Sequence, residues 1–205
     1  MGIVGKVLVA GLLCLVALAQ PALALNKPGA SAREYGETLP PIGFVEFCQR
    51  NADVCDQRAE GKRKLAMDEE KWLLVRMVNA FVNGAIAPVT DETLYGTPEY
   101  WTIPADAGDC EDIVLLKKKI LQQKGIPAEA LRITVVLDEQ AEGHAVLTLV
   151  TTKGDFVLDN RRNDIRSWHA ANYTMLKRQS AQDPRKWVSL ESSSKDSAFG
   201  GTASK

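Results

Sequence analysis

The chain has 205 residues, with 25 Lys and Arg against 26 Asp and Glu, so its formal net charge at pH 7 is −1. This balance, without a basic stripe, excludes a protein that binds nucleic acid or another polyanion through a positive surface. Without the N-terminal segment described next, about 180 residues remain, which is enough for one domain with a full hydrophobic core.

The first 24 residues have the order of a secretory signal peptide. Lys6 supplies a positive charge, residues 7–19 are mostly apolar, and Ala22-Leu23-Ala24 offers a cleavage site. The apolar run is short for a membrane span of about 20 residues, and the residues before Cys14 lack the small side chain typical of a lipoprotein signal. We expect cleavage after Ala24 and a protein that is secreted from the cytosol. Its charge would be −2, because only Lys6 is lost from the 25 basic residues and all 26 acidic ones stay.

Three cysteines remain after this cleavage, and an odd number cannot all pair within one chain. Cys48 and Cys55 are close in the sequence and are expected to form a disulfide, because the protein would mature outside the cytosol. Cys110 is then a free thiol. Such a thiol is either buried and inert or a nucleophile, so its neighbours in the sequence decide its interpretation.

In the first half of the chain, the pattern predicts two helices separated by extended or irregular segments. Residues 25–43 are rich in Gly, Pro and Ser and are expected to be an extended lead-in, and a short helix follows over 44–50. From Asp68 the apolar residues recur at spacings of three and four, which predicts a helix that ends near Gly84 with a left-handed cap. The prolines of 85–105 predict irregular chain.

A third helix is predicted to begin at Cys110 and to end before Gly125, with apolar residues on one face and the lysines of 117–119 on the other. The segments that follow are rich in β-branched and apolar residues and are expected to form an antiparallel sheet. The predicted strands are 131–137, 144–151, 156–158, a short segment at 168, 173–178 and 186–190. The tail over 191–205 is predicted to be disordered, so the folded domain is expected over 44–190.

Cys110 has the sequence neighbours that a nucleophile needs. It lies on the first turn of its predicted helix, where unpaired backbone N–H groups lower the pKa of a thiol. Of the two histidines, His144 begins an apolar strand at the rim of the sheet, whereas His169 lies in a polar loop, so His144 is the better base. Asp159 ends the next strand and is expected beside His144 as the orienting group, with Asn160 as the fallback. Cys110, His144 and Asp159 are therefore the predicted catalytic triad of a cysteine hydrolase.

Acidic residues crowd the predicted nucleophile, namely Asp106, Asp109, Glu111 and Asp112. Their negative charge raises the pKa of a nearby thiol and so opposes its role. Two interpretations remain open from the residues alone. The carboxylates cap the helix and face water, or a hard cation such as calcium, which takes oxygen ligands, neutralises them and orders the loop.

Several blocks of residues, taken together and in order, are similar to those of a known family. The blocks include Pro41-Ile42-Gly43-Phe44, Pro88-Val89-Thr90-Asp91, Glu99-Tyr100-Trp101, Gly108-Asp109-Cys110-Glu111-Asp112, Gly143-His144-Ala145-Val146, Gly154-Asp155-Phe156-Val157-Leu158-Asp159 and Lys177-Arg178-Gln179-Ser180. Through them the chain resembles the bacterial transglutaminase-like cysteine proteinases of the LapG type. The resemblance extends over about 41–180, which is nearly the whole of the expected mature domain.

The resemblance implies an α+β fold of the papain/transglutaminase-like type, in which N-terminal helices pack on an antiparallel sheet and the nucleophile sits at a helix N-terminus. It implies a periplasmic endopeptidase whose triad falls on the three residues named above. It also implies a calcium ion bound beside the nucleophile. Asp109 and Glu111 match the family's flanking acidic positions, and Asp112 is a weaker candidate ligand.

The resemblance also implies partners. Characterised members of the family cleave large surface adhesins and release cells from biofilm, and an inner-membrane receptor for cyclic di-GMP holds them. The partners expected for this chain are therefore a protein substrate such as an adhesin and a receptor of that kind. Two other functions use the same residues: a transglutaminase or amidase that passes the acyl group to a different acceptor, and a non-catalytic module that docks to a receptor.

Overall fold

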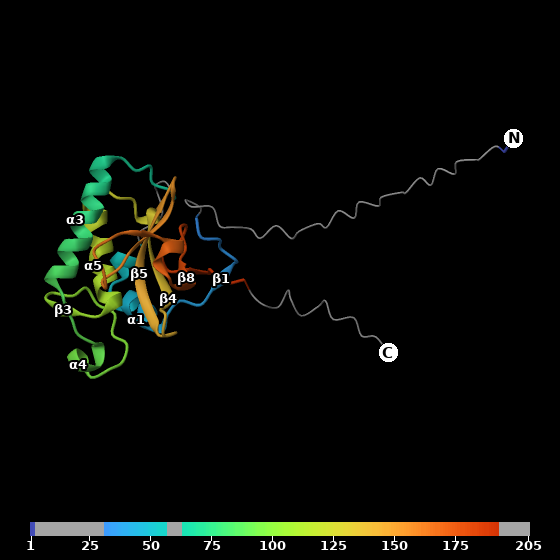
Figure 1. Cartoon of the computed structure of the whole chain (residues 1–205). Coiled ribbons are helices and arrows are strands. Elements are labelled where there is room, and N and C mark those ends of the chain that lie inside the picture. Colours follow the sequence, from blue (N-terminus) through green and yellow to red (C-terminus); the bar gives the residue numbers. More distant parts are fainter. Residues whose placement is uncertain (3–30, 57–62, 193–205) are drawn as a thin grey trace, which may run out of the picture.

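The structure, a computed structural model, describes residues 1–2, 31–56 and 63–192 of the chain. In these ranges, helices pack on a sheet of antiparallel strands, which confirms the expected α+β class (Figure 1). The predicted signal peptide over 1–24, apart from its first two residues, and the predicted tail from residue 193 lie outside the described residues. Within the described ranges, no helix combines the length and apolar character needed to cross a bilayer.

The α-helices of the described residues all lie in the first two thirds of the chain, and the strands of the main sheet, except β1, follow them. The helices are α1 (Ile42–Arg50), α2 (Ala52–Cys55), α3 (Glu69–Ala85), α4 (Asp91–Tyr95), α5 (Cys110–Gln123) and the 3₁₀ turns η1 (Ala128–Ala130) and η2 (Trp168–Ala171). The strands are β1 (Glu37–Thr38), β2 (Ala87–Pro88), β3 (Ala107–Gly108), β4 (Leu131–Leu137), β5 (Gly143–Thr151), β6 (Gly154–Leu158), β7 (Arg166–Ser167), β8 (Thr174–Gln179) and β9 (Trp187–Ser189).

The main sheet has the strand order β1-β9-β8-β4-β5-β6-β7, and each neighbouring pair is antiparallel. The predicted meander is present within it, since β5 pairs with both β4 and β6. In this register Val136 lies opposite His144 and Leu147 lies opposite Leu158. The strand predicted at residue 168 is wrong: this residue lies in η2, where the chain turns back from the edge strand β7 toward β8.

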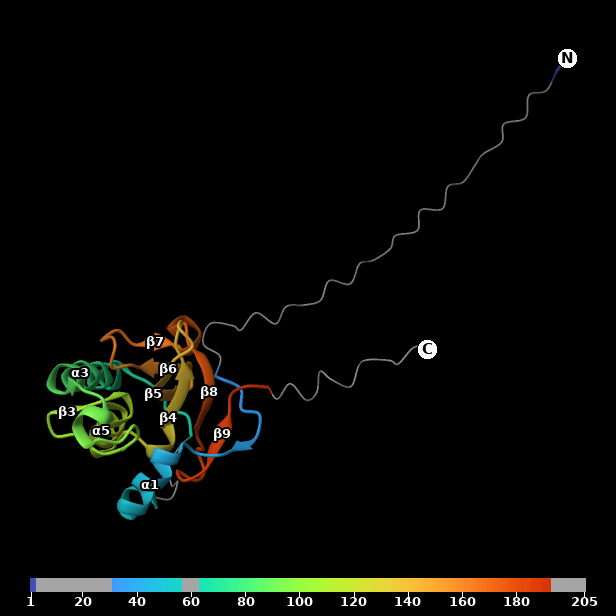
Figure 2. The same ribbon diagram turned by 90° about the horizontal axis from the view of Figure 1, so that it is seen from below.

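The long helices cover one face of the sheet. Helix α5 packs against β5, and α3 packs beside α5 on the same side (Figure 2). The two helices bury apolar side chains such as Val75, Val82, Ile113 and Leu121, which join Leu147 of β5 in one core. The start of α5 is therefore anchored in the main hydrophobic core.

Helix α3 begins as predicted, because the side chain of Asp68 accepts a hydrogen bond from Lys71 N at 2.8 Å. Its predicted end near Gly84 is confirmed to within one residue, but the predicted left-handed cap is wrong. The helix runs through Gly84 to Ala85, and the buried Ile86 continues in extended conformation toward β2. A left-handed glycine would turn the chain away from β3, with which β2 pairs. The segment 85–105, predicted to be irregular, therefore contains β2 and also α4.

Helix α5 starts at Cys110 and gives way to a left-handed Gly125 with φ 87°, as predicted. The prediction that its lysines all face away from the core is wrong. Lys117 is fully buried, and the half-buried Lys118 donates to Leu131 O and Gln179 Oε1, whereas Lys119 is exposed. Because α3 covers one side of α5 and the sheet covers another, only a narrow strip of α5 reaches water.

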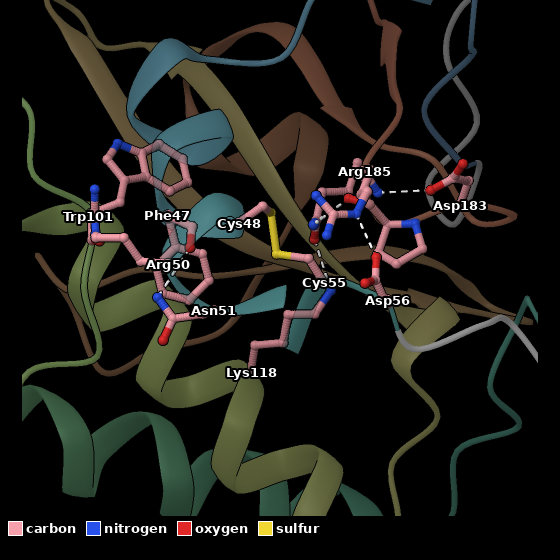
Figure 3. Close-up of a disulfide and its surroundings, with 12 residues drawn as sticks. Phe47, Cys48, Arg50, Asn51, Cys55, Asp56, Trp101, Lys118, Asp183 and Arg185 are labelled. Carbon is pink, nitrogen blue, oxygen red and sulfur yellow. Dashed lines mark hydrogen bonds and ion pairs between the residues drawn. A yellow bond between two sulfur atoms is a disulfide. The ribbon is translucent and has the colours of Figure 1, made fainter. Parts of the chain in front are cut away.

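The predicted disulfide between Cys48 and Cys55 is present and joins α1 to α2 (Figure 3). Near it, Arg50 Nη2 donates to the carbonyl oxygen of Trp101 at 2.9 Å. Phe44 of α1 also contacts Trp101, with 5.7 Å between ring centroids. These contacts fix the short N-terminal helices against the chain that leads into α5.

Candidate active site

Cys110 is the first residue of α5, and its half-buried thiol touches both the helix and the sheet. The backbone N–H of Ala145 on β5 donates to Cys110 Sγ at 3.4 Å, and the thiol donates to Glu111 Oε2 at 3.0 Å. Ala145 follows His144 directly. The packing of α5 on β5 therefore brings the thiol to the strand that carries the predicted base.

His144 and Asp159 lie side by side, at the start of β5 and just after β6. Their side chains are 2% and 1% exposed, and His144 Nε2 lies 3.0 Å from Asp159 Oδ1. The arrangement follows from the hairpin, because the pairing of Leu147 with Leu158 carries the end of β6 toward the start of β5. The fallback orienter, Asn160, has a buried Oδ1 without a hydrogen-bond partner among the described residues.

Asp159 is held as an anion by its hydrogen bonds. Burial alone would raise its pKa, but hydrogen bonds from His144, Tyr173 and Arg161 N lower the pKa of Asp159 to about 2. The Tyr173 hydroxyl donates to Asp159 Oδ2 at 2.5 Å, and Arg161 N donates to Oδ1 at 3.0 Å. Sequence reasoning did not find Tyr173, because a tyrosine just before a strand carries no local signal of such a contact.

A cavity of about 240 Å³ adjoins both Cys110 and His144. Trp101 forms part of its wall, and a Cβ on Gly43 would lie 2.4 Å from the Trp101 ring, so only glycine fits at the start of α1. Its other lining residues are Pro41, Glu99, Glu111, Val135, Gly143, Ala145 and Lys177. A carbonyl group of a bound polypeptide could therefore reach the thiol and the imidazole from one cavity.

Three carboxylates gather beside the thiol. Asp91, Asp109 and Glu111 each place one oxygen so that the three atoms lie within 4.8 Å of one another. Burial and the charge of Asp109 raise the pKa of Glu111 to about 8. Burial and the charge of Glu111 likewise raise the pKa of the Cys110 thiol well above its usual range. Without a compensating positive charge, this cluster therefore opposes formation of the thiolate.

The oxygens of the cluster fit a hard cation. Asp91 Oδ1 and Asp109 Oδ1 are buried and have no hydrogen-bond partner in the described part of the chain. Calcium is bound by carboxylate oxygens of this kind. The donor set therefore fits the calcium ion that the sequence led us to expect.

The structure changes which carboxylates surround such an ion. Asp109 and Glu111 are in the cluster, but Asp112 is not: its Oδ1 accepts a hydrogen bond from Thr102 N at 2.7 Å. Asp91, which sequence reasoning did not select, takes its place. Its N–H donates to Asp109 Oδ2 at 3.4 Å. The two residues are neighbours because each follows one strand of the parallel pair of β2 and β3. The only signal for it was the block Pro88-Val89-Thr90-Asp91, which carries part of the family resemblance.

Comparisons with known proteins agree with this architecture. The sequence profile of the family described as bacterial transglutaminase-like cysteine proteinase, BTLCP, matches residues 34–195. The solved structure of Legionella pneumophila LapG has a TM-score of 0.51 at 24% identity and covers 62% of this chain and 74% of its own. The calcium-bound form of that protein has a TM-score of 0.51 at 23% identity, with 76% and 93% covered.

An EGTA-treated form of Legionella pneumophila LapG gives a TM-score of 0.50 at 25% identity, and it covers 64% of this chain and 71% of its own. No curated protein matches the sequence. The structural likeness establishes the fold, and the profile match, which spans most of the chain, establishes the family.

Proposed function

Since the chain belongs to the bacterial transglutaminase-like cysteine proteinases and is a cysteine protease, we propose that Cys110, His144 and Asp159 are its catalytic triad. One observation supports this most strongly. The thiol at the start of α5 contacts the backbone of Ala145, and the preceding residue, His144, is bound through Nε2 by an ionised Asp159. No other cysteine of the described residues is free.

The geometry gives each residue a separate task. Asp159 holds Nε2 of His144, which leaves Nδ1 to take the proton of the Cys110 thiol. The thiolate attacks the carbonyl carbon of the scissile peptide bond, and His144 then gives its proton to the leaving amine, so that a thioester remains. A water molecule, deprotonated by His144, attacks the thioester and releases the acid and the thiol. The backbone N–H of Cys110 at the start of α5 is the proposed first donor to the oxyanion.

We further propose that Asp91, Asp109 and Glu111 hold a calcium ion, with Asp112 as a weaker candidate behind them. When bound, the ion supplies positive charge that offsets the carboxylates and so favours the thiolate. This charge matters because, without it, Glu111 Oε2 accepts a hydrogen bond from the Cys110 thiol at 3.0 Å. A Glu111 carboxylate that binds calcium would no longer accept this hydrogen bond, and the thiol would be free to give its proton to His144.

The triad is tested by replacing Cys110 and each of the two histidines in turn. Cys110→Ala and His144→Ala proteins should both lose cleavage of a labelled casein, by about 10³-fold or more, with little change in unfolding temperature. His169→Ala is the matched control and should cleave like the wild type. A Cys110→Ala protein that still cleaves would refute the assignment.

The calcium site is tested by isothermal titration calorimetry of chelator-treated protein with Ca²⁺. Asp91→Asn and Asp109→Asn should weaken binding at least about tenfold, because each removes a charged ligand. Asp112→Asn should have a smaller effect. Removal of calcium should stop cleavage reversibly. Binding that is unaffected by Asp91→Asn and Asp109→Asn would show that the acidic residues only cap the helix.

We propose a periplasmic location and a large cell-surface protein, such as an adhesin, as the substrate, with an inner-membrane receptor for cyclic di-GMP as a partner. The support is the family resemblance and the N-terminal segment expected to direct export. Cells that carry Cys110→Ala should retain on their surface a protein that wild-type cells release, and fractionation should find the protease in the periplasm. Equal surface proteins in both strains would contradict this substrate class.

The sequence alone also allowed a transglutaminase or amidase and a non-catalytic docking module. Membership of a cysteine proteinase family favours hydrolysis over both. A labelled amine and a glutamine-containing peptide separate the reactions: a protease cleaves the chain, whereas a transglutaminase incorporates the amine.

A further inference from the structure

Resting on the proposed triad, we propose that Tyr173 is a positioning residue for catalysis: its hydroxyl locks the carboxylate of Asp159 and its ring supports the imidazole of His144. Tyr173 lies just before β8, far along the chain from the thiol. It does not adjoin the cavity beside Cys110, so it acts through its neighbours and not on the substrate.

The hydrogen bonds of Asp159 show the locking. Oδ1 lies 3.0 Å from His144 Nε2 and accepts from Arg161 N at 3.0 Å, while Oδ2 accepts from the Tyr173 hydroxyl at 2.5 Å. Oδ1 is therefore held by His144 and Arg161, and Oδ2 is held by Tyr173, which comes from a later segment of the chain. A carboxylate bound at one oxygen alone can rotate about its Cβ–Cγ bond, whereas one bound at both is fixed.

The ring of Tyr173 makes a second contact with the triad. Its centroid lies 5.6 Å from that of His144, at an interplanar angle of 63°, which is an edge-to-face arrangement. The Tyr173 side chain therefore restrains the imidazole through its ring and the carboxylate through a hydrogen bond to Oδ2. Loss of the hydroxyl and loss of the ring should have separable effects.

The sheet explains why this tyrosine reaches the triad. Val136 of β4 lies opposite His144 on one side and opposite Met175 on the other, so Tyr173 is near the strand position next to the histidine. The residue before it, Asn172, adopts a left-handed conformation with φ 61°. Asparagine tolerates this conformation better than most residues, and here it closes η2 and directs Tyr173 inward, where it packs with Val136 and Met175.

The chemistry of the hydroxyl suits a permanent donor. Burial and the bond to Asp159 raise the pKa of Tyr173, so the phenol stays protonated in the range where the protease would work. Phenylalanine would keep the ring and its packing and remove only this donor. Asp159 would then keep two of its three donors.

The test is a double-mutant cycle of Tyr173→Phe and Asp159→Asn. Tyr173→Phe should lower kcat about 10- to 100-fold at nearly constant KM, because it removes a hydrogen bond to a charged group. In the Asp159→Asn background it should cost little more, since it acts through Asp159. The downfield proton resonance of the His144–Asp159 hydrogen bond should shift or broaden in Tyr173→Phe. Tyr35→Phe, at an exposed tyrosine, is the matched control.

Two outcomes would overturn the proposal. One is wild-type kcat and an unchanged proton resonance in Tyr173→Phe. The other is an equal fold loss of kcat from Tyr173→Phe in the wild-type and Asp159→Asn backgrounds. That result would mean that Tyr173 has a general packing role and does not act through Asp159, whether or not the variant is also less stable. Failure of the proposed triad is distinguishable, because an active Cys110→Ala protein would refute the triad whatever Tyr173→Phe does.

Discussion

Two buried carboxylates of the site, Asp159 beside His144 and Glu111 beside Cys110, have opposite properties. Asp159, after β6, has donors for both oxygens, and its pKa falls to about 2. Glu111, on the first turn of α5, faces Asp109 and Asp91, and its pKa rises to about 8. Both residues are taken out of water, so burial does not cause the difference. It comes from whether the surrounding chain supplies donors or more negative charge.

The site has two ends, one at Asp159 and the other at the acidic cluster of Asp91, Asp109 and Glu111. The described residues supply everything that the Asp159 end needs to stay charged, so this end is complete, whereas the acidic end is incomplete. The Asp159 end needs only protein atoms to stay ionised. The cluster at the start of α5 needs a positive charge that no described residue brings into it, since no salt bridge among the described residues involves its three carboxylates. Asp159 is therefore suited to its proposed role of orienting His144, whereas the acidic cluster needs a bound cation to balance its charge.

The largest effect should come from breaking the complete end. Asp159→Asn replaces an ionised acceptor with a neutral amide that cannot stabilise the imidazolium, so kcat should fall on the order of 10³-fold or more. Steady-state cleavage of a labelled protein measures it. Asp164→Asn, in an exposed ion pair with Arg166, is the matched control and should leave kcat unchanged. Equal activity of the two variants would remove Asp159 from the mechanism.

A smaller effect should come from relieving the incomplete end. In calcium-free protein, Glu111→Gln removes the neighbouring charge that helps to raise the pKa of Cys110, so the thiol should ionise at lower pH. Alkylation of Cys110 by iodoacetamide at pH 7 should be faster than in chelated wild type, on the order of tenfold. The same variant should lose calcium binding. Slower alkylation would show that Glu111 helps the thiolate and does not oppose it.

The pH dependence of stability should differ in sign between the two ends. The pKa of Asp159 is lowered from 3.8 to about 2, so its contribution is present above about pH 4 and is lost as the pH falls through 2. The loss should be about 2 kcal/mol. Glu111 has the opposite sign, since in calcium-free protein its contribution is lost as the pH rises through about 8. Urea unfolding from pH 2 to 9 measures both, and Asp159→Asn should flatten only the acidic side.

The smallest effect concerns Lys117, a buried ammonium on α5 that interacts with the charge of Asp159. Burial lowers its pKa to about 7, although the charge of Asp159 opposes this, and its Nζ has no hydrogen-bond partner within the described ranges. Lys117→Met should therefore stabilise the protein, by about 1 kcal/mol. Thermal unfolding at pH 6 measures it, and Lys119→Met, at an exposed position, should change little. A clear destabilisation would show that Lys117 supports Asp159 more than its burial costs.

Much of the fold could be predicted because its patterns are local. The helical spacing after Asp68, the glycine at 125 and the alternation of the β4–β6 meander each depend on a short window of sequence, and the structure confirms them. The left-handed cap predicted at the end of α3 was wrong because the pairing of β2 with β3, a contact between distant segments, decides the direction in which the chain leaves the helix.

The candidate site divides in the same way. Cys110, His144 and Asp159 were selected from their places at the ends of elements. In the structure Cys110 and His144 line one cavity, and a hydrogen bond joins His144 to Asp159. Asp91 and Tyr173 were missed because their roles depend on which distant segments the fold brings together. The buried Lys117 was missed because a run of three lysines is typical of a solvated helix face.

The order of the site residues along the chain has a consequence for biosynthesis. The proposed nucleophile on α5 is translated before the strand that carries the proposed base, and Tyr173, proposed to fix the orienting carboxylate, comes last, just before β8. A chain still leaving the ribosome would therefore carry a thiol without a partner. With the proposed triad, cleavage would require the late strands to have joined the sheet, so an unfinished chain would be inactive.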